Sequence, residues 1–294
     1  MNKKIAAIIV TFNRKDLLVE CIDNLKKQTI KLSEIIVVNN NSNDGTKEIL
    51  TTIKGITVIN LEKNIGGAGG FNIGLRYAYE KGYDFFWAMD DDTMANNDAL
   101  QALVVEYNIL SQKENIGFLS SNVLWVDKTP CFMNVPVVNQ VFNEYADRGV
   151  LKIKSTSFVS LFLTRHALKE CGLPIKEFFI WGDDWEFTKR ISEKFNNYFV
   201  GKSIVVHKMK NNSPADIVND TNRIDRYFYD YRNRIYVNKN DGMKYLIKHI
   251  LKIMFTIIEI VLKSPGKKLK RIGILLKGTL MGIIFNPKIE YFES

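Results

Sequence analysis

The chain has 294 residues, of which 46% are hydrophobic and 25% are charged, with only six prolines and three cysteines. This length exceeds the ~100–200 residues of a typical single domain, which favours one sizeable α/β domain with an appendage. The composition is sufficient to fill a core and excludes a disordered or fibrous chain. The cysteines share no short spacing, which disfavours a disulfide framework or a zinc site and favours a reducing compartment.

The positive charge is concentrated near the C-terminus. Of a net charge of +9, residues 244–277 contribute +8, from nine basic side chains and one acidic one. Residues 1–243 carry 31 basic and 29 acidic side chains and are nearly neutral. This distribution argues against nucleic acid as a partner of the body and favours a tail that meets an anionic surface.

The predicted elements begin with an apolar run over residues 5–10, which is too short for a signal peptide and indicates a buried strand. Hydrophobic periodicity predicts further strands at 34–38, 56–60 and 84–89, and helices at 14–28, 45–53 and 70–80. This alternation implies an α/β fold with a mostly parallel, Rossmann-like sheet and helices on both faces. Ligands of such sheets bind beyond the carboxyl ends of the strands.

The second half of the chain alternates less regularly. Helices are predicted at 95–111, 184–194 and 223–236, strands at 155–163 and 198–206, and a mixed region at 112–155. We expect a catalytic domain over residues 1–240 and a basic helical tail over residues 241–294. No stretch reaches the ~18 uncharged apolar residues that a membrane span requires.

The tail has the pattern of amphipathic helices. Charged residues lie along one side of a helix, at Lys244, Lys248, Lys252, Glu259 and Lys263. Apolar residues lie away from them, at Leu246, Ile250, Ile253, Ile257 and Val261. A break at residues 264–266 precedes a second basic, apolar segment at 267–285. These helices could pack on the body or join two copies of the chain, but their charge favours in-plane insertion into the anionic inner face of a cell membrane.

Three adjacent acids, Asp90, Asp91 and Asp92, follow the strand at 84–89. On extended backbone Asp90 and Asp92 point the same way, and two carboxylates on one side suit Mg²⁺ or Mn²⁺. His207, after the strand at 198–206, offers an imidazole to the same ion. The alternatives are a solvated acidic turn and a structural histidine.

Other segments also combine residue types that bind or activate substrates. Residues 64–74 are rich in glycine at a helix start, which suits either the close approach of a diphosphate or a tight turn. Amides and hydroxyls in residues 11–14 and 39–46 could contact a nucleotide or form turns. Residues 181–187 place two acids beside two indoles, which suits a catalytic base facing a sugar, with a helix cap as the alternative.

Together these segments resemble the family 2 glycosyltransferases, which are inverting enzymes with the GT-A fold. The resemblance covers about residues 4–240 and depends on five motifs in the family's order: residues 10–14, 37–46, 90–92 and 182–187, and His207. Residues 64–71 and 89–93 are similar to the galactofuranosyltransferase branch, whereas related rhamnosyltransferases often have Asp-Gln-Asp-Ser. The family's usual Asp-Asp-Gly-Ser is replaced here by Asn40-Asn41-Ser42, which leaves the nucleobase open.

The resemblance implies a donor site and a metal site. Asp90, Asp92 and His207 would hold Mn²⁺ or Mg²⁺ against the diphosphate of a nucleotide-sugar donor. The donor itself would be lined by Thr11, Asn13, Arg14, Asn40, Asn64, Gly69 and Asp91.

The resemblance also implies the reaction. Asp184 would be the base and Asp183 would orient the acceptor hydroxyl, with Trp181 and Trp185 shaping the acceptor pocket. The favoured reaction moves galactofuranose from a UDP-sugar to a lipid-linked oligosaccharide, and a dTDP-rhamnose donor is the alternative. A sugar-phosphate nucleotidyltransferase would begin with a glycine- and arginine-rich loop ending in lysine, which residues 11–14 lack. A non-catalytic glycan-binding module would not need both acids.

Overall fold

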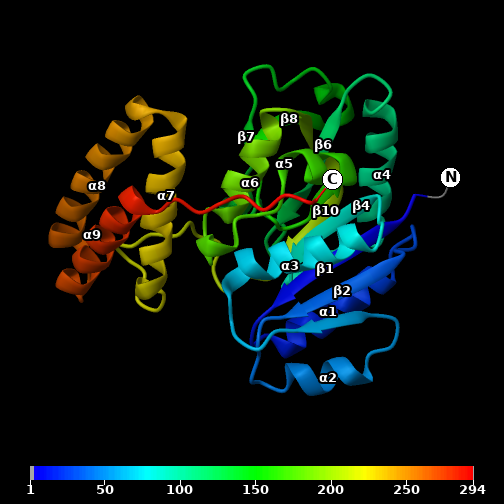
Figure 1. Cartoon of the computed structure of the whole chain (residues 1–294), viewed down its shortest axis with the longest axis horizontal. Helices are drawn as coiled ribbons and strands as arrows, with labels where there is room; N and C mark the ends of the chain where they lie inside the picture. Colours follow the sequence, from blue (N-terminus) through cyan, green and yellow to red (C-terminus); the bar gives the residue numbers. More distant parts are fainter. Residues whose placement is uncertain (1–2, 294) are drawn as a thin grey trace.

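A computed structural model describes residues 3–293 (Figure 1). The first half of the chain forms four parallel strands in the order β3-β2-β1-β4. They are β1 (Ile5–Thr11), β2 (Glu34–Asn39), β3 (Thr57–Asn60) and β4 (Phe85–Asp90). The connecting helices are α1 (Lys15–Lys26), α2 (Thr46–Thr52) and α3 (Gly66–Glu80). The predicted alternation of strand and helix is confirmed for this half.

The second half extends the same sheet beyond β4, in the order β9-β6-β10-β8-β7, with parallel and antiparallel pairs. These strands are β6 (Ile116–Leu124), β7 (Val137–Val138), β8 (Val150–Ser155), β9 (Leu161–Thr164) and β10 (Asn196–His207). The short strand β5 (Thr93–Ala95) pairs with β10. The helices of this half are α4 (Ala99–Leu110), α5 (Arg165–Cys171) and α6 (Asp183–Ser192).

The sheet is covered on both faces because side chains alternate along its buried strands. In β1, alternate residues from Ile5 pack in one cluster with α1, α2 and α4, whereas those from Ala6 pack in another with α3, α5 and α6. The α/β prediction with helices on both faces is therefore confirmed. The three cysteines are buried and free.

Two predicted elements in the second half are wrong at their boundaries. The helix predicted over residues 95–111 begins at Ala99, because residues 93–95 pair with β10. The strand predicted over residues 155–163 is interrupted between β8 and β9. Ser160, in the interruption, has a left-handed φ of 62°, and its hydroxyl accepts a hydrogen bond from the Trp87 indole at 2.9 Å. This tertiary contact has no signature in the local periodicity.

Helix α3 lies unusually close to β1 because of its glycines. A Cβ atom on Gly70 would lie 2.4 Å from Val10 Cγ1, and one on Gly74 would lie 2.5 Å from Ile8 Cγ2. Gly66, with a φ of +79°, leaves no room for a Cβ beside the carbonyl oxygen of Phe179. Packing therefore explains these glycines without a bound diphosphate, and α3 begins four residues before the predicted start at Gly70.

Substituting Gly70 by alanine should destabilise the protein. The added methyl must displace Val10 in a tightly packed interior, and overpacking of this kind costs about 1–3 kcal/mol. Urea unfolding followed by circular dichroism would measure the free energy of unfolding. Gly67→Ala is the matched control, because no atom of the described residues lies within 4 Å of its new Cβ. Equal stability of the two variants would contradict the packing explanation.

Three further helices form a unit beside the sheet: α7 (Tyr227–Asp241), α8 (Met243–Lys263) and α9 (Lys268–Ile284) (Figure 1). Their shared core contains Tyr227, Tyr231, Ile235, Ile253, Ile260 and Leu275. The unit begins with α7, before the expected domain boundary at residue 240. Among the described residues, none of the helices is long and apolar enough to cross a membrane.

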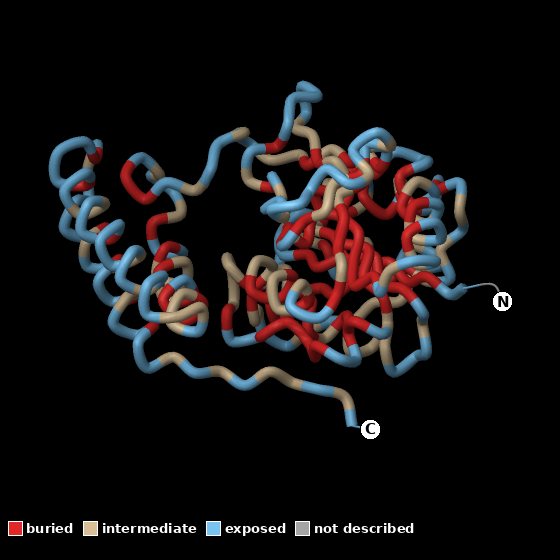
Figure 2. The backbone as a smooth tube through the Cα atoms, turned by 90° about the horizontal axis from the view of Figure 1, so that it is seen from above, coloured by how far each residue is buried: buried red, intermediate tan, exposed pale blue. Residues whose placement is uncertain are grey.

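The C-terminal segment, residues 285–293, runs from this unit back to the body (Figures 1 and 2). Glu290 accepts a hydrogen bond from Arg76 of α3 at 2.6 Å and also pairs with Lys176. The ring of Phe292 stacks on Tyr79, with 3.6 Å between the ring centroids. The helical unit is therefore tied to the body at both of its ends.

Candidate active site

Sheet pairing brings the predicted metal ligands together. Val10 of β1 lies opposite Asp90, the last residue of β4. The chain then turns into β5, whose Thr93 pairs with His207 at the end of β10. The ligand atoms of Asp90, Asp92 and His207 consequently lie within 4.8 Å of one another. The pattern of β4 predicts the two aspartates, but only the β5–β10 pairing brings the histidine to them.

The orientation of His207 suits a cation. Its Nδ1 lies 2.8 Å from the amide oxygen of Asn134, which requires a hydrogen on Nδ1. In the neutral ring, the lone pair of Nε2 then faces Asp92 Oδ1 at 3.0 Å. This buried oxygen has no hydrogen-bond donor within residues 3–293 unless Nε2 is protonated. Two facing acceptors require either a proton or a metal ion between them, so these residues fit a divalent cation.

The pKa shifts of Asp90, Asp92 and His207 agree with a cation site formed by these three side chains. Burial raises the pKa of Asp90 to about 6, and the charge of Asp92 adds to the effect. Burial lowers the pKa of His207, but the hydrogen bonds to Asp92 and Cys131 and the charges of Asp92 and Asp90 together outweigh burial and raise the value to about 10. Burial likewise opposes ionisation of Asp92, yet the contact with His207 lowers its pKa. Without a metal, His207 therefore keeps a proton in the place that a cation would take.

Asn134, which orients His207, is a site residue that the sequence did not indicate. It lies after β6 in the region of mixed pattern, and its amide oxygen also accepts from Cys131 Sγ at 2.9 Å. Its amide nitrogen donates to Ser157 Oγ at 2.8 Å. No local motif marks this asparagine, because His207, the residue that it orients, lies 73 residues away in the chain.

Asp91 faces the loop that follows β1. The Thr11 hydroxyl donates to Asp91 Oδ2 at 2.7 Å, and burial raises the pKa of Asp91 to about 7. Arg14 pairs with both Asp91 and Asp92 while half of its side chain stays exposed. Thr11 and Asp91 thus bind each other in this structure. Of Thr11, Asp91 and Arg14, only Arg14 has a side chain that is half exposed to solvent, and it contacts Asp92.

The other predicted donor residues build the loops around the site. Asn40 is buried, and its amide accepts from Ile65 N at 2.9 Å and donates to Gly66 O at 2.8 Å. Asn64 accepts from Gly66 N at 2.8 Å.

The side chains of Asn40 and Asn64 therefore fix the start of α3, and the contact of these residues with a donor stays a prediction. Gly69 is in contact with Ile65 of its own helix turn, where a Cβ would lie 2.7 Å from Ile65 Cδ1. Asn13 is exposed and accepts from Asn43 N at 2.8 Å, which joins the loops after β1 and β2.

Asp183 and Asp184 begin α6. The N-cap residue is Gly182, with a φ of 85°, so neither acid occupies the N-cap position, although Asp184 accepts from Trp185 N in the first turn. Burial raises the pKa of Asp184 to about 6 and that of Asp183 well above its usual value. The negative charge of Asp90 also raises both pKa values, so the two acids interact electrostatically with one of the three metal-ligand candidates.

Both predicted acceptor-site tryptophans lie partly buried next to this pair. Trp181 packs on Tyr227 of α7, with 5.0 Å between the ring centroids. Trp185 packs against a small cluster that includes Phe178 and Tyr236. Each indole is thus held on one side by the helical unit.

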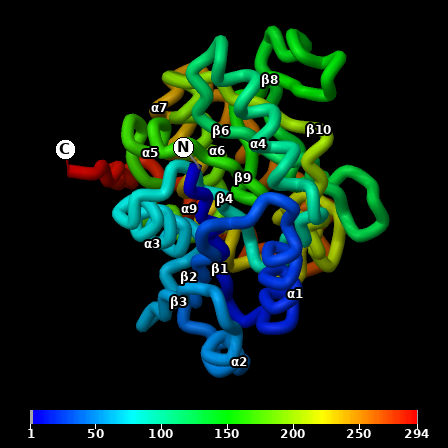
Figure 3. Tube along the Cα trace, turned by 90° about the vertical axis from the view of Figure 1, so that its right-hand side faces the viewer, coloured from blue at the N-terminus to red at the C-terminus, as the bar shows by residue number. Residues whose placement is uncertain are grey.

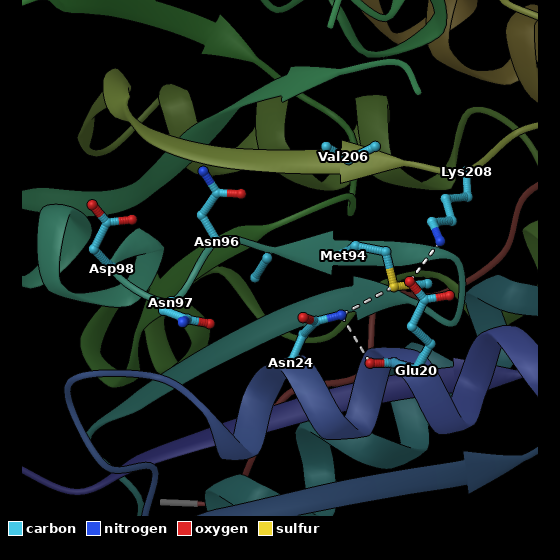
Figure 4. Close-up of a pocket in the computed structure, with 9 residues that line it drawn as sticks. Glu20, Asn24, Met94, Asn96, Asn97, Asp98, Val206 and Lys208 are labelled. Carbon is cyan, nitrogen blue, oxygen red and sulfur yellow. Dashed lines mark hydrogen bonds and ion pairs between the residues drawn. The ribbon is translucent and has the colours of Figure 1, made fainter. Parts of the chain in front are cut away.

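A separate hollow of about 460 Å³ lies between α1, β5 and the end of β10 (Figure 4). Its wall includes the ion pair between Glu20 and Lys208, at 2.5 Å, and Asn24 beside Met94. The predicted site residues are all described, and none of them lines this hollow. We therefore do not assign it to the candidate active site.

Comparison with known proteins points to one family. Residues 6–108 match the family model described as glycosyl transferase family 2. The chain is 24% identical over 280 residues to the galactofuranosyltransferase GlfT1 of Mycobacterium tuberculosis, covering 84% of this chain and 86% of GlfT1. It is 34% identical over 107 residues to the dTDP-rhamnosyl transferase RfbF of Shigella flexneri, covering 35% of this chain and 34% of RfbF.

The fold agrees with that family. The crystal structure of GalNAc-T7 with UDP, GalNAc and Mn²⁺ matches 86% of this chain and 55% of its own, with a TM-score of 0.58 and 15% identity. At this identity the match concerns the fold alone. The matched family model, the relatives and the sheet topology lead to one conclusion: residues 6–108 form a glycosyl transferase family 2 domain, within a chain that has the GT-A fold.

Proposed function

We propose that the protein is an inverting galactofuranosyltransferase. The donor would be a UDP-sugar and the acceptor a hydroxyl of a lipid-linked oligosaccharide in cell-surface polysaccharide synthesis. The observation that carries the reaction type is Asp184 at the start of α6, a carboxyl whose pKa is raised by burial and by the charge of Asp90, which belongs to the cluster of Asp90, Asp92 and His207. The similarity to GlfT1 over most of both chains supports galactofuranose. The shorter similarity to RfbF keeps dTDP-rhamnose as the alternative donor.

In this proposal Asp90, Asp92 and His207 hold Mn²⁺ or Mg²⁺, and GalNAc-T7, which shares the fold, was crystallised with Mn²⁺ and UDP. A divalent cation bound there neutralises the charge that develops on the departing nucleoside diphosphate. Arg14 pairs with Asp92 and is half exposed, so its guanidinium can turn to a diphosphate oxygen once these acids bind a cation.

The proton of the acceptor goes to Asp184. Its pKa of about 6 leaves the carboxyl ionised at neutral pH but more basic than an ordinary aspartate. Burial also raises the pKa of Asp183 well above its usual value, and this acid would orient the acceptor hydroxyl through a hydrogen bond. The acceptor oxygen then forms its bond to the anomeric carbon as the bond to the diphosphate oxygen breaks. One such displacement inverts the anomeric centre.

Release of nucleoside diphosphate from separate nucleotide sugars would test the proposal. We expect UDP release from UDP-galactofuranose in the presence of a membrane lipid extract, and much slower release from UDP-galactose, UDP-N-acetylglucosamine and dTDP-rhamnose. Asp184→Asn under the same conditions controls for contaminating enzymes. Preference for dTDP-rhamnose would favour the alternative donor, and no release from any donor would contradict the proposed function.

We also propose that the helical unit binds a membrane surface. One apolar face of α8 is buried against α7 within the unit. A second apolar face of α8 is exposed, and the exposed fractions of its side chains are 42–72% (Figure 2). These residues are Met243, Ile247, Ile250, Leu251, Met254, Ile258, Val261 and Leu262. Apolar residues of α9 are similarly exposed: Leu269, Leu276, Leu280, Ile283 and Ile284. Exposed apolar surface of this extent is typical of an interaction site.

Basic side chains border this face. Lys244, Lys248, Lys252 and Lys263 lie on α8, and each such residue near anionic lipid contributes about 1 kcal/mol. Arg271 does not belong to this group: it is 1% exposed and donates to the carbonyl oxygens of residues 217, 220 and 266, which fixes α9 in place. An apolar face flanked by lysines suits in-plane insertion at the inner face of a cell membrane, where a lipid-linked acceptor is held.

The membrane proposal predicts a specific loss of lipid binding. Leu251→Asp combined with Ile258→Asp should lower partitioning into phosphatidylglycerol vesicles by about 100-fold. Each lost apolar side chain contributes about 1.5–3 kcal/mol on burial, and added acids repel anionic lipid. Co-sedimentation at low and high salt would measure the effect. These substitutions are preferable to truncation after Asn240, which would uncover the buried face of α7.

The control introduces two aspartates at exposed apolar positions of α4 instead of α8. Val105 and Ile109 of α4 are 46% and 42% exposed, so Val105→Asp with Ile109→Asp should leave vesicle binding unchanged. A lipid-independent dimer that the α8 substitutions dissociate would instead support a contact between two copies. Absence of vesicle binding by the intact protein would contradict the membrane proposal.

A further inference from the structure

The segment that leads into the base motif has an unfavourable backbone conformation. Phe179 and Trp181 have φ values of 66° and 63°, and Gly182 follows with 85°. Positive φ values are unfavourable for residues other than glycine, and they persist only where surrounding contacts hold them. The conformation of residues 179–182 therefore depends on contacts from outside the segment.

Asn233 of α7 supplies these contacts. Its side chain is fully buried, and its amide nitrogen donates to the carbonyl oxygens of Phe178, Ile180 and Trp181, at 3.0, 3.2 and 2.7 Å. The neighbouring Arg232 donates to the amide oxygen of Asn233 from Nε at 3.0 Å and from Nη2 at 2.9 Å. The Asn233 oxygen thus faces the donors of Arg232, and the Asn233 nitrogen faces backbone carbonyl oxygens. These contacts determine the orientation of the Asn233 amide.

Arg232 also contacts the same segment directly. Its Nη2 lies 2.6 Å from the carbonyl oxygen of Glu177, and its guanidinium lies 4.0 Å from the ring centroid of Phe285. The oxygen of Asn233 is therefore held by a cation that is itself fixed between the body and the C-terminal segment. An aspartate at 233 would keep the contact with Arg232 but could not donate to the three carbonyl groups.

Residues 178–182, which Asn233 and Arg232 hold, connect to the proposed base and also contact the start of α3. At its far end it continues into Asp183 and Asp184. In its middle, the Phe179 carbonyl accepts from Ala68 N at 3.2 Å, in the first turn of α3. A shift of the segment would therefore move Asp183 and Asp184 and disturb the contact with the first turn of α3, to which Asn40 and Asn64 also bond.

We infer that Asn233 is a positioning residue, which fixes the base Asp184 through residues 178–182. This inference rests on the proposed role of Asp184 and adds that α7, outside the sheet, determines where the base lies. Catalysis depends on placement within about 1 Å, and misplacement of that size can cost about 100-fold in rate.

Kinetics of Asn233→Ala would test the inference. We expect kcat for UDP release from UDP-galactofuranose to fall by about 10–100-fold, while KM for the donor changes less than twofold. The acid limb of the pH–rate profile should also shift, because the surroundings of Asp184 change. Asn238→Ala is the control on the same helix: its amide donates only to Arg234 O, at 2.7 Å, and kcat should be unchanged.

Hydrogen exchange gives a readout that needs no substrate. In Asn233→Ala the peptide covering residues 177–185 should exchange faster, whereas peptides of β1 and β4 should not change. If that variant does not fold, Arg232→Lys, which keeps the charge but loses the two-pronged contact, should produce the same changes to a smaller degree. Wild-type exchange and wild-type kcat in both variants would overturn the inference. Failure of the wild type to use any donor would count against the proposed function but not against the exchange result.

Discussion

Replacing Asp184 by asparagine should lower the turnover number by about 10²–10⁴-fold, the usual contribution of a general base. The substitution keeps the size of the side chain and an oxygen that can accept from Trp185 N, as Asp184 does at 2.7 Å. The loss should therefore appear in kcat, with the affinity for the nucleotide sugar unchanged. Stopped assays of UDP release and equilibrium binding of UDP would separate the two quantities.

The assignment of Asp184 as the base also predicts how turnover depends on pH. Burial raises the pKa of Asp184 to about 6, and the carboxyl must be deprotonated to accept the acceptor proton. Turnover should therefore be constant near pH 7 and above, and fall about tenfold per pH unit as the pH decreases below 6. In Asp184→Asn this limb should disappear from the residual rate.

Asp183→Asn distinguishes the two acids. Burial raises the pKa of Asp183 well above its usual value, which favours the neutral acid, and an asparagine resembles that form. We expect a small loss from this substitution. A larger loss than that of Asp184→Asn would show that the two roles are reversed.

Removing divalent cations should abolish transfer, and Mn²⁺ or Mg²⁺ should restore it. Asp90, Asp92 and His207 converge within 4.8 Å, and Asp92→Asn removes one of their two carboxylates. Mn²⁺ binding measured by electron paramagnetic resonance gives a readout independent of activity. Full activity in excess chelator would contradict the metal assignment.

The contact between Asn134 and His207 makes the metal prediction more specific. Partners that orient a metal-binding histidine typically contribute 10–100-fold in metal affinity, and we expect that loss in Asn134→Ala. Glu20→Gln is a suitable control, because Glu20 is an acid paired with Lys208, next to His207 in the chain, but is not one of the three ligands. Equal Mn²⁺ affinity of Asn134→Ala and the wild type would show that His207 needs no orienting partner.

Much of the fold follows from local sequence patterns. Uninterrupted apolar runs predict β1, β2 and β4 because a strand buried on both faces must be apolar at every position. The period-two geometry of a strand also predicts that Asp90 and Asp92 share a side. The amphipathic tail is evident from its spacing, and the order of five short motifs identifies the family without any knowledge of contacts.

Only the tertiary structure shows which polar atoms are already used in contacts within the protein. The sequence cannot show that Asn40 uses both ends of its amide on α3, or that Gly70 is needed for a helix to approach Val10. It likewise cannot pair His207 with Asp92, since that contact depends on the register between β5 and β10. Asn233 has no local signature either, because its three acceptors lie more than 50 residues away along the chain. Local periodicity determines elements, whereas hydrogen-bond partners distant in sequence depend on how those elements pack. In this protein such partners orient the proposed metal ligand His207 and hold the segment that leads to the proposed base Asp184.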